Sequence, residues 1–274
     1  MDVCAWLRLM RPANSLAAAG LVLIGGHLAM GWPWSPRVWE AAAAMWAVTT
    51  FGYVTNDLHD IPVDRINKPD RPLPSGRVDV GAARLAAIVL AMIAIALASH
   101  FDALAIGAAV AVLGALLLYN WALKGAVLLG NALIALLSGL ALGVGSYAAG
   151  QRSLPWLPAL LVCLFILARE ILKTIEDVEG DRRAGLRTLA TVWGLRRAAQ
   201  VYAWTIGGFV AASIAAYFLA GYRPAYLIVI VGVDAGLIQS ARWVLRAPTA
   251  AHARAGLRIS KVGYFLGLLA LLLA

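Results

Sequence analysis

Long apolar segments separated by short polar loops are the feature that most restricts how this chain can fold. A helix needs about 20 residues to cross the hydrocarbon core of a bilayer, so apolar runs of about 18 residues or more indicate membrane-spanning helices. The sequence predicts nine of them, at residues 13–31, 38–56, 82–99, 103–119, 125–147, 154–172, 198–220, 225–244 and 256–274. We therefore expect an all-α, polytopic membrane protein that is a single domain over residues 1–274, with about nine transmembrane helices around a central cavity.

The basic residues predict how this bundle is oriented. Of the 23 Lys and Arg residues, only Arg37, Arg152 and Arg223 fall in loops on one of the two sides. Because cytoplasmic loops of membrane proteins are enriched in Lys and Arg, the other side is predicted to be cytoplasmic, with the N-terminus there and the C-terminus outside. The resulting basic rim suits anionic lipid headgroups, whereas nucleic acid is not an expected partner because the chain has no soluble basic domain.

Acidic residues are concentrated in two short windows. Ten of the 14 Asp and Glu residues lie within residues 57–79 and 170–181, each after an apolar segment and among several Lys and Arg residues. A carboxylate near hydrocarbon costs at least ~2.5 kcal/mol on insertion scales, so a retained one usually faces a wet cavity, a cation or a partner charge. A single Asp at a helix end is usually a solvated surface residue, but two such windows indicate a site for metal ions and a phosphorylated ligand.

In the first window, oxygen-bearing side chains recur every four residues. Asn56, Asp60 and Asp64 would share one face of a continuous helix. Pro62 lacks a backbone N–H and is expected to kink or end that helix near Asp60. The orientation of Asp64 therefore depends on a bent segment.

The second window repeats this spacing with Lys173, Asp177 and Asp181, and Gly180 is expected to loosen the end of the helix. Each window follows the second helix of a predicted four-helix group, which suggests an ancient duplication into two four-helix repeats with the ninth helix left over. Such a repeat would bring both windows to one cavity.

Mg²⁺ suits two short carboxylate rows because it binds few protein carboxylates and completes its shell with water and phosphate oxygens. Basic residues are available for the remaining phosphate charge at Lys68, Arg71, Lys124, Lys173 and Arg182.

These residues resemble the signature of the UbiA superfamily of intramembrane prenyltransferases, an N-D-x-x-D-x-x-x-D motif and a second D-x-x-x-D motif. Residues 56–64 match the first motif in full, and residues 177–181 match the second. The likeness extends over nearly the whole chain and includes the number of helices. The resemblance implies transfer of a prenyl group from an allylic prenyl diphosphate to an acceptor inside the bilayer.

Longer stretches narrow the resemblance. Residues 64–76, DRINKPDRPLPSG, together with residues 119–124 and 169–181, are most similar to the digeranylgeranylglyceryl phosphate synthases, which alkylate a glycerol-phosphate ether-lipid precursor. That similarity implies geranylgeranyl diphosphate as donor and geranylgeranylglyceryl phosphate as acceptor. Two positions depart from the family pattern: Pro62 lies within the first motif, and Ala190 stands where Pro is common.

The resemblance also implies roles for individual residues. Ionisation of an allylic C–O bond leaves negative charge on the diphosphate, which Mg²⁺ and fixed Lys and Arg side chains stabilise. The expected Mg²⁺ ligands, direct or through water, are Asn56, Asp60, Asp64, Asp177 and Asp181. Asp57, Tyr119 and Lys173 are the other candidate catalytic residues. Asp57 would lie behind the metal ligands or on the acceptor side, and Tyr119 would hydrogen-bond the diphosphate, shield the carbocation, or only anchor the helix at the interface.

Two other functions compete with this interpretation. An aromatic prenyltransferase of the quinone, tocopherol, haem or chlorophyll type would keep the chemistry and change the acceptor. An ion-coupled transporter would also use repeats and buried acids, but transporters place these residues near the bilayer midplane, whereas here they lie at one membrane face.

Overall fold

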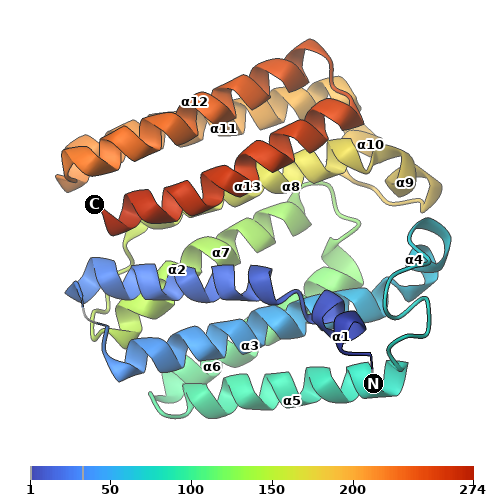
Figure 1. Cartoon of the computed structure of the whole chain (residues 1–274), viewed down its shortest axis with the longest axis horizontal. Coiled ribbons are helices and arrows are strands. Elements are labelled where there is room, and N and C mark those ends of the chain that lie inside the picture. The colour runs from blue at the N-terminus through green and yellow to red at the C-terminus, as the bar shows by residue number, and fades with distance from the viewer. Residues whose placement is uncertain (1, 33) are drawn as a thin grey trace.

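The chain is described by a computed structural model that covers residues 2–32 and 34–274, without the side chains of residues 66 and 67. In this described part it is helical, with no strand (Figure 1). The long helices are α2 (Pro12–Met30), α3 (Pro36–His59), α5 (Val80–Ala98), α6 (Ala103–Leu118), α7 (Leu129–Ala148), α8 (Trp156–Glu176), α11 (Leu195–Ala220), α12 (Pro224–Arg246) and α13 (Ala250–Leu272). Short elements connect them: α1 (Val3–Met10), α4 (Ile61–Asn67), α9 (Val178–Arg183), α10 (Leu189–Trp193) and a π-helical turn (Tyr119–Leu123) after α6.

Each predicted apolar segment overlaps one long helix, so the prediction of an all-α membrane bundle is confirmed. Seven of these helices are long and apolar enough to cross a bilayer among the residues described, with α6 counted together with the π-helical turn. The other two long helices, α3 and α8, carry polar and charged side chains toward their motif ends. Nine crossings therefore stay a prediction.

The helices run side by side in an order that repeats. Helix α3 packs against α2 and α5, and α8 packs correspondingly against α7 and α11. Helix α2 also packs against α7, and α13 packs against α12, α8 and α2. This is the arrangement that two four-helix groups with an additional α13 would produce. Figure 1 shows α1, α4, α9 and α10 at one end of the bundle, with the N-terminus at that end and the C-terminus at the other.

Small residues allow α2 and α7 to approach closely. A Cβ atom on Gly145 would lie 1.8 Å from the carbonyl oxygen of Val22, and one on Gly25 would lie 2.0 Å from the carbonyl oxygen of Leu142. Since helices in lipid associate mainly through van der Waals packing, such contacts hold the two groups together at the centre of the bundle.

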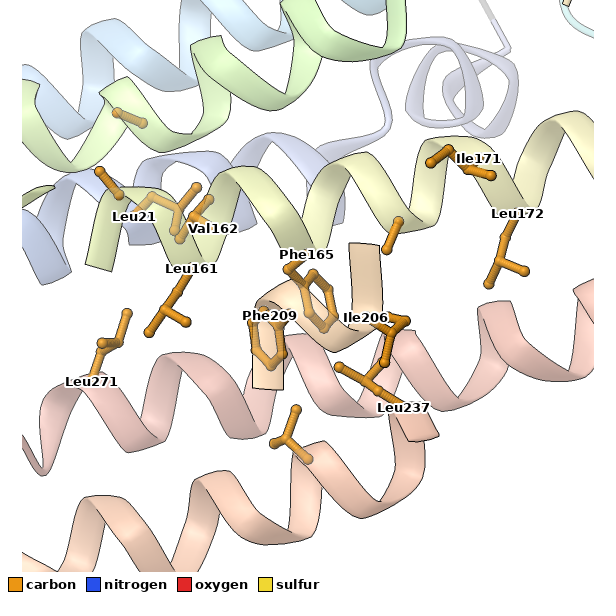
Figure 2. Packing of buried hydrophobic residues seen from close by; sticks show 14 of the residues in the cluster. Leu21, Leu161, Val162, Phe165, Ile171, Leu172, Ile206, Phe209, Leu237 and Leu271 are labelled. Carbon is orange, nitrogen blue, oxygen red and sulfur yellow. The ribbon is translucent and has the colours of Figure 1, made fainter. Parts of the chain in front are cut away.

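The second group packs around aromatic side chains. Figure 2 shows Phe165 of α8 directed toward Phe209 of α11, with their ring centroids 5.8 Å apart. Ile206 and Leu237 lie beside them, and all four side chains are buried. This packing fixes α8, whose far end carries the second acidic motif.

Candidate active site

The first acidic motif lies across a break between two helices. Helix α3 ends at His59, Asp60 occupies the break, and α4 begins with Pro62 in its first turn. This confirms the expected effect of Pro62. The N–H of Asp60 donates to the carbonyl of Asn56 at 2.9 Å, and that of Asp64 donates to the carbonyl of Asp60 at 2.8 Å. These bonds keep the motif residues on successive turns through the break.

The second motif follows the same backbone course. Helix α8 ends at Glu176 and α9 begins at Val178, so Asp177 occupies this break as Asp60 does the first. The N–H of Asp177 donates to the carbonyl of Lys173 at 2.9 Å, and that of Asp181 donates to the carbonyl of Asp177 at 2.8 Å. The helix therefore ends before Gly180, which lies inside α9.

Arginine side chains bind the buried carboxylates of the first motif. Arg71 Nη1 lies 2.6 Å from Asp64 Oδ2 and 3.6 Å from Asp57 Oδ1. Arg11 Nη2 donates to Asp57 Oδ1 at 2.6 Å. Asp57 and Asp64 are only 4% and 5% exposed, so these pairs keep their charges compensated where water is scarce.

A lysine completes the first motif. The Lys124 ammonium donates to both carboxylate oxygens of Asp60, and to Asn56 Oδ1 at 3.2 Å. Asn56 Nδ2 in turn donates to Asp60 Oδ2 at 3.0 Å. The sequence predicted Asn56 and Asp60 as metal ligands and Lys124 as a phosphate contact. The structure brings all three side chains together.

The π-helical turn positions Lys124, which follows it directly. Such turns are often found at functional sites because they displace the residues after them from the regular helix. Buried Asn120 in this turn donates to Thr55 Oγ1 of α3 at 3.2 Å. The ring of half-buried Tyr119 lies so close to Gly130 that a Cβ atom there would be 2.9 Å from Tyr119 Cε2. Contacts on two sides therefore hold the turn and Tyr119 in place.

The basic residues of the second motif bind other acids. Lys173 pairs with Glu170, and exposed Arg182 pairs with Glu179 at 3.3 Å. Lys68 is also exposed, where α4 ends. Within the described residues, none of these three predicted phosphate contacts forms an ion pair with a motif carboxylate, in contrast to Arg71 and Lys124.

Electrostatics link the two motifs. The pKa of Asp181 is raised to about 6, first by burial and second by the negative charge of Asp177. The hydrogen bond from Thr188 and the positive charges of Lys124 and Lys68 act in the opposite direction on this pKa. Because Lys124 is bound to Asp60, the two motifs share one electrostatic environment at the end of the bundle where α4 and α9 lie (Figure 1).

Residues 18–269 match the model of the UbiA prenyltransferase family, which is most of the chain. The chain belongs to this family. A digeranylgeranylglyceryl phosphate synthase from Halobacterium salinarum is 40% identical over 238 residues, which cover 86% of each chain. The resemblance predicted from the two motifs is therefore confirmed.

Solved structures agree with this membership. The structure of a digeranylgeranylglyceryl phosphate synthase matches 99% of this chain and 98% of its own, with a TM-score of 0.80 and 28% identity. A UbiA homologue from Archaeoglobus fulgidus, bound to DMAPP and Mg²⁺, matches 97% of this chain and 98% of its own, with a TM-score of 0.69 and 20% identity. The latter likeness is one of fold.

The donor atoms of this UbiA site suit a magnesium ion shared with phosphate. Among the residues described, no three His, Cys, Asp or Glu side chains converge on one point. Mg²⁺ does not require such a cluster, because it is commonly bound through one or two carboxylates, waters and substrate phosphate oxygens. Asp60 and Asp64 already attract cationic groups, and neither Asp177 nor Asp181 forms an ion pair within the described residues. The carboxylates at the two helix breaks, after α3 and after α8, are therefore suitable ligands for Mg²⁺.

Arg11 is the residue of the UbiA site that the sequence analysis missed. It lies between α1 and α2 in a left-handed backbone conformation with φ of 47°. Its guanidinium carbon is 5.0 Å from the centre of the Tyr53 ring while the group binds Asp57. In the sequence near Arg11, Pro12 indicates where α2 begins, but it does not indicate that Arg11 binds Asp57, 46 residues away.

Proposed function

We propose that this chain is a Mg²⁺-dependent transferase that moves a geranylgeranyl group from geranylgeranyl diphosphate to geranylgeranylglyceryl phosphate in ether-lipid synthesis. The observation that carries the proposal is the pair of acidic motifs with matching helix breaks at one end of a membrane bundle, next to bound Lys and Arg side chains. Family membership supports prenyl transfer, and the names of the relatives support this acceptor.

The proposed metal ligands come from both motifs: Asn56, Asp60, Asp64, Asp177 and Asp181. Bound Mg²⁺ would supply positive charge to the diphosphate oxygens, where negative charge grows as the allylic C–O bond breaks. Lys124 and Arg71 lie against Asp60 and Asp64, so they are within reach of a diphosphate that meets those carboxylates. Both cations would then donate hydrogen bonds to the leaving group.

The remaining predicted residues receive more limited roles. Asp57 binds Arg11 and Arg71, which supports a role in orienting these cations behind the metal ligands. Tyr119 is held against α7, which supports shielding of the allylic cation. Exposed cations at the same end are proposed to hold further phosphate charge: Lys68, Lys173 and Arg182.

The site is proposed to face the cytoplasm. It lies at the end of the bundle that holds the N-terminus (Figure 1), and only three of the 23 Lys and Arg residues lie at the other end, in loops or the first turn of α3. The positive-inside rule supports this orientation. A mono-cysteine scan with a membrane-impermeant thiol reagent would test it.

The first experiment is a reaction of the purified protein in detergent with Mg²⁺, geranylgeranyl diphosphate and one acceptor at a time. The acceptors are geranylgeranylglyceryl phosphate, the same ether without phosphate, 4-hydroxybenzoate and 1,4-dihydroxy-2-naphthoate, and products are identified by mass spectrometry. We expect a doubly prenylated glyceryl phosphate that disappears with EDTA. A product from an aromatic acceptor alone would overturn the acceptor and keep prenyl transfer, whereas no product and no diphosphate release would favour a transporter.

A further inference from the structure

A polar cavity lies at the end of the bundle opposite the acidic motifs. Its volume is about 210 Å³, more than ten times the ~10–15 Å³ that a cavity needs to hold one water. The start of α3 and the connections α5–α6 and α7–α8 form it, at the ends of these helices that are remote from α4 and α9 (Figure 1). The lining residues are Arg37, Phe101, Asp102, Tyr147, Gly150 and Arg152.

The cavity carries two guanidinium groups, and the positive charge of Arg152 acts on Asp102 in the same lining. Neither Arg37 nor Arg152 forms an ion pair within the described residues, and Arg37 lies over the ring of Phe101 at 5.9 Å. The one acid in the lining, Asp102, accepts hydrogen bonds from the N–H of Ala105 at 3.0 Å and from the Tyr147 hydroxyl. Two Arg and one Asp leave a net charge of +1, and the oxygens of that Asp are engaged by the chain itself. Glu40, one turn after Arg37, lies outside the lining and 3.6 Å from His100.

Tryptophan residues place this cavity at the level of lipid headgroups. The rings of Trp32, Trp34 and Trp39 contact one another edge to face, with centroids 4.3 and 5.3 Å apart, beside the start of α3. Trp156, which opens α8, is 60% exposed. Trp is enriched where the membrane meets water, because its ring is apolar and its N–H is polar.

The charge pattern of the whole chain makes these arginines unusual. Only Arg37, Arg152 and Arg223 lie on this side, and two of the three line one cavity. In the proposed orientation this end is the non-cytoplasmic one, where Lys and Arg are disfavoured, so two Arg residues in one cavity favour a ligand of opposite charge. A phosphate group suits two guanidinium groups, which donate in pairs to its oxygens.

We propose that this cavity binds the phosphate group of a membrane lipid headgroup in the leaflet opposite the acidic motifs. The same chemistry would accept free inorganic phosphate, so the source of the phosphate has to be distinguished by experiment. The proposal does not depend on which prenyl acceptor the chain uses.

Arginine labelling of the wild-type protein in detergent tests the site directly. Phenylglyoxal modification of individual Arg residues is followed by peptide mass spectrometry, alone or with dioleoyl phosphatidic acid, dioleoylglycerol or inorganic phosphate. We expect phosphatidic acid to slow modification of Arg37 and Arg152 several-fold and to leave Arg223, on the same side but outside the cavity, unchanged. Equal protection by dioleoylglycerol would show that the phosphate group is not what binds. Equal protection by inorganic phosphate would show that the ligand need not be a lipid. Protection of neither Arg37 nor Arg152, or equal protection of Arg223, would contradict a binding site in this cavity.

A matched pair of variants gives a second test. Native mass spectrometry should show that the Arg37→Gln/Arg152→Gln double variant retains several-fold less phosphatidic acid than Arg223→Gln, with melting temperatures showing that both are folded. Equal retention by the two folded variants would contradict the proposal, because both lose charge on the same side of the membrane.

Discussion

The two acidic motifs have the same backbone course but differ in how their charges are compensated. In both, an Asp occupies a helix break and the same two backbone hydrogen bonds cross it. In the first motif Arg71 and Lys124 bind the carboxylates of Asp64 and Asp60. In the second, no ion pair involves Asp177 or Asp181 among the residues described, and the neighbouring cations pair with Glu170 and Glu179.

This difference indicates a division of labour within one site. The first motif carries its own cations, Lys124 and Arg71, so its carboxylates are compensated without a ligand; under the proposed function these two cations would contact the phosphate. The second motif offers carboxylates that the chain does not neutralise, which favours them as the more accessible ligands for an added cation. Two helix breaks with the same backbone hydrogen bonds can therefore carry electrostatically different motifs.

Removing the central carboxylate of either motif should reduce activity more than any other change considered below. Asp60→Asn and Asp177→Asn should each lower kcat by ~10³-fold, because both remove charge that positions the leaving diphosphate. Steady-state product formation measures this, with size-exclusion profiles to show that the variants are folded. Asp70→Asn and Glu179→Gln, acids of the same windows outside the motif positions, should keep wild-type rates. Near-normal turnover in one motif variant alone would show that the two halves do not act together.

The next effect distinguishes the lysines of the two halves. Lys124→Gln should lower kcat/KM for the prenyl diphosphate by about 10- to 100-fold, the equivalent of losing one hydrogen bond from a charged donor. Lys173→Gln should cost less, because Lys173 is exposed and paired with Glu170. The comparison uses initial rates at several diphosphate concentrations. A larger loss of kcat/KM for Lys173→Gln than for Lys124→Gln would mean that the second motif, and not the first, supplies the more important lysine.

A stability measurement sharpens the same contrast. Arg11→Gln leaves buried Asp57 with two longer contacts, to Arg71 at 3.6 Å and to Asn56 at 3.5 Å, and should lower the free energy of unfolding by about 1–3 kcal/mol. Arg182→Gln breaks an exposed pair with Glu179 and should cost about 0–1 kcal/mol. Melting temperatures of the two variants in one detergent show which substitution is more destabilising. Equal melting temperatures would mean that the buried ion pair of the first motif is worth no more than the exposed pair of the second.

The smallest effect concerns pH and the second motif. The pKa of Asp181 is about 6 in the folded protein and 3.8 without its environment, so the folded state binds this proton more tightly. Its contribution to stability is therefore fully present below pH 3.8 and is lost as pH rises through about 6. In EDTA, the melting temperature of the wild type should fall relative to Asp181→Asn across this window. A difference in melting temperature that stays constant between pH 3.8 and 6 would contradict a raised pKa of Asp181.

Several features of the site followed from residue order. Pro62 predicted the first helix break because proline cannot donate the backbone hydrogen bond there. Gly180 was a poorer guide, since the second break lies at Asp177 and no residue with a comparable backbone restriction marks it. The partners of Asp57 were not predictable, because any of many Lys and Arg residues satisfies the same charge requirement until the helices are placed.

Local hydropathy and short residue spacings were sufficient to predict an all-α membrane bundle, the order of its long helices, the two motifs and the family. They could not predict that Arg11 binds Asp57, that Lys124 binds Asp60, or that Arg37 and Arg152 line one cavity. Each of these pairs joins residues far apart in the chain, and which of them meet depends on how all the helices pack together.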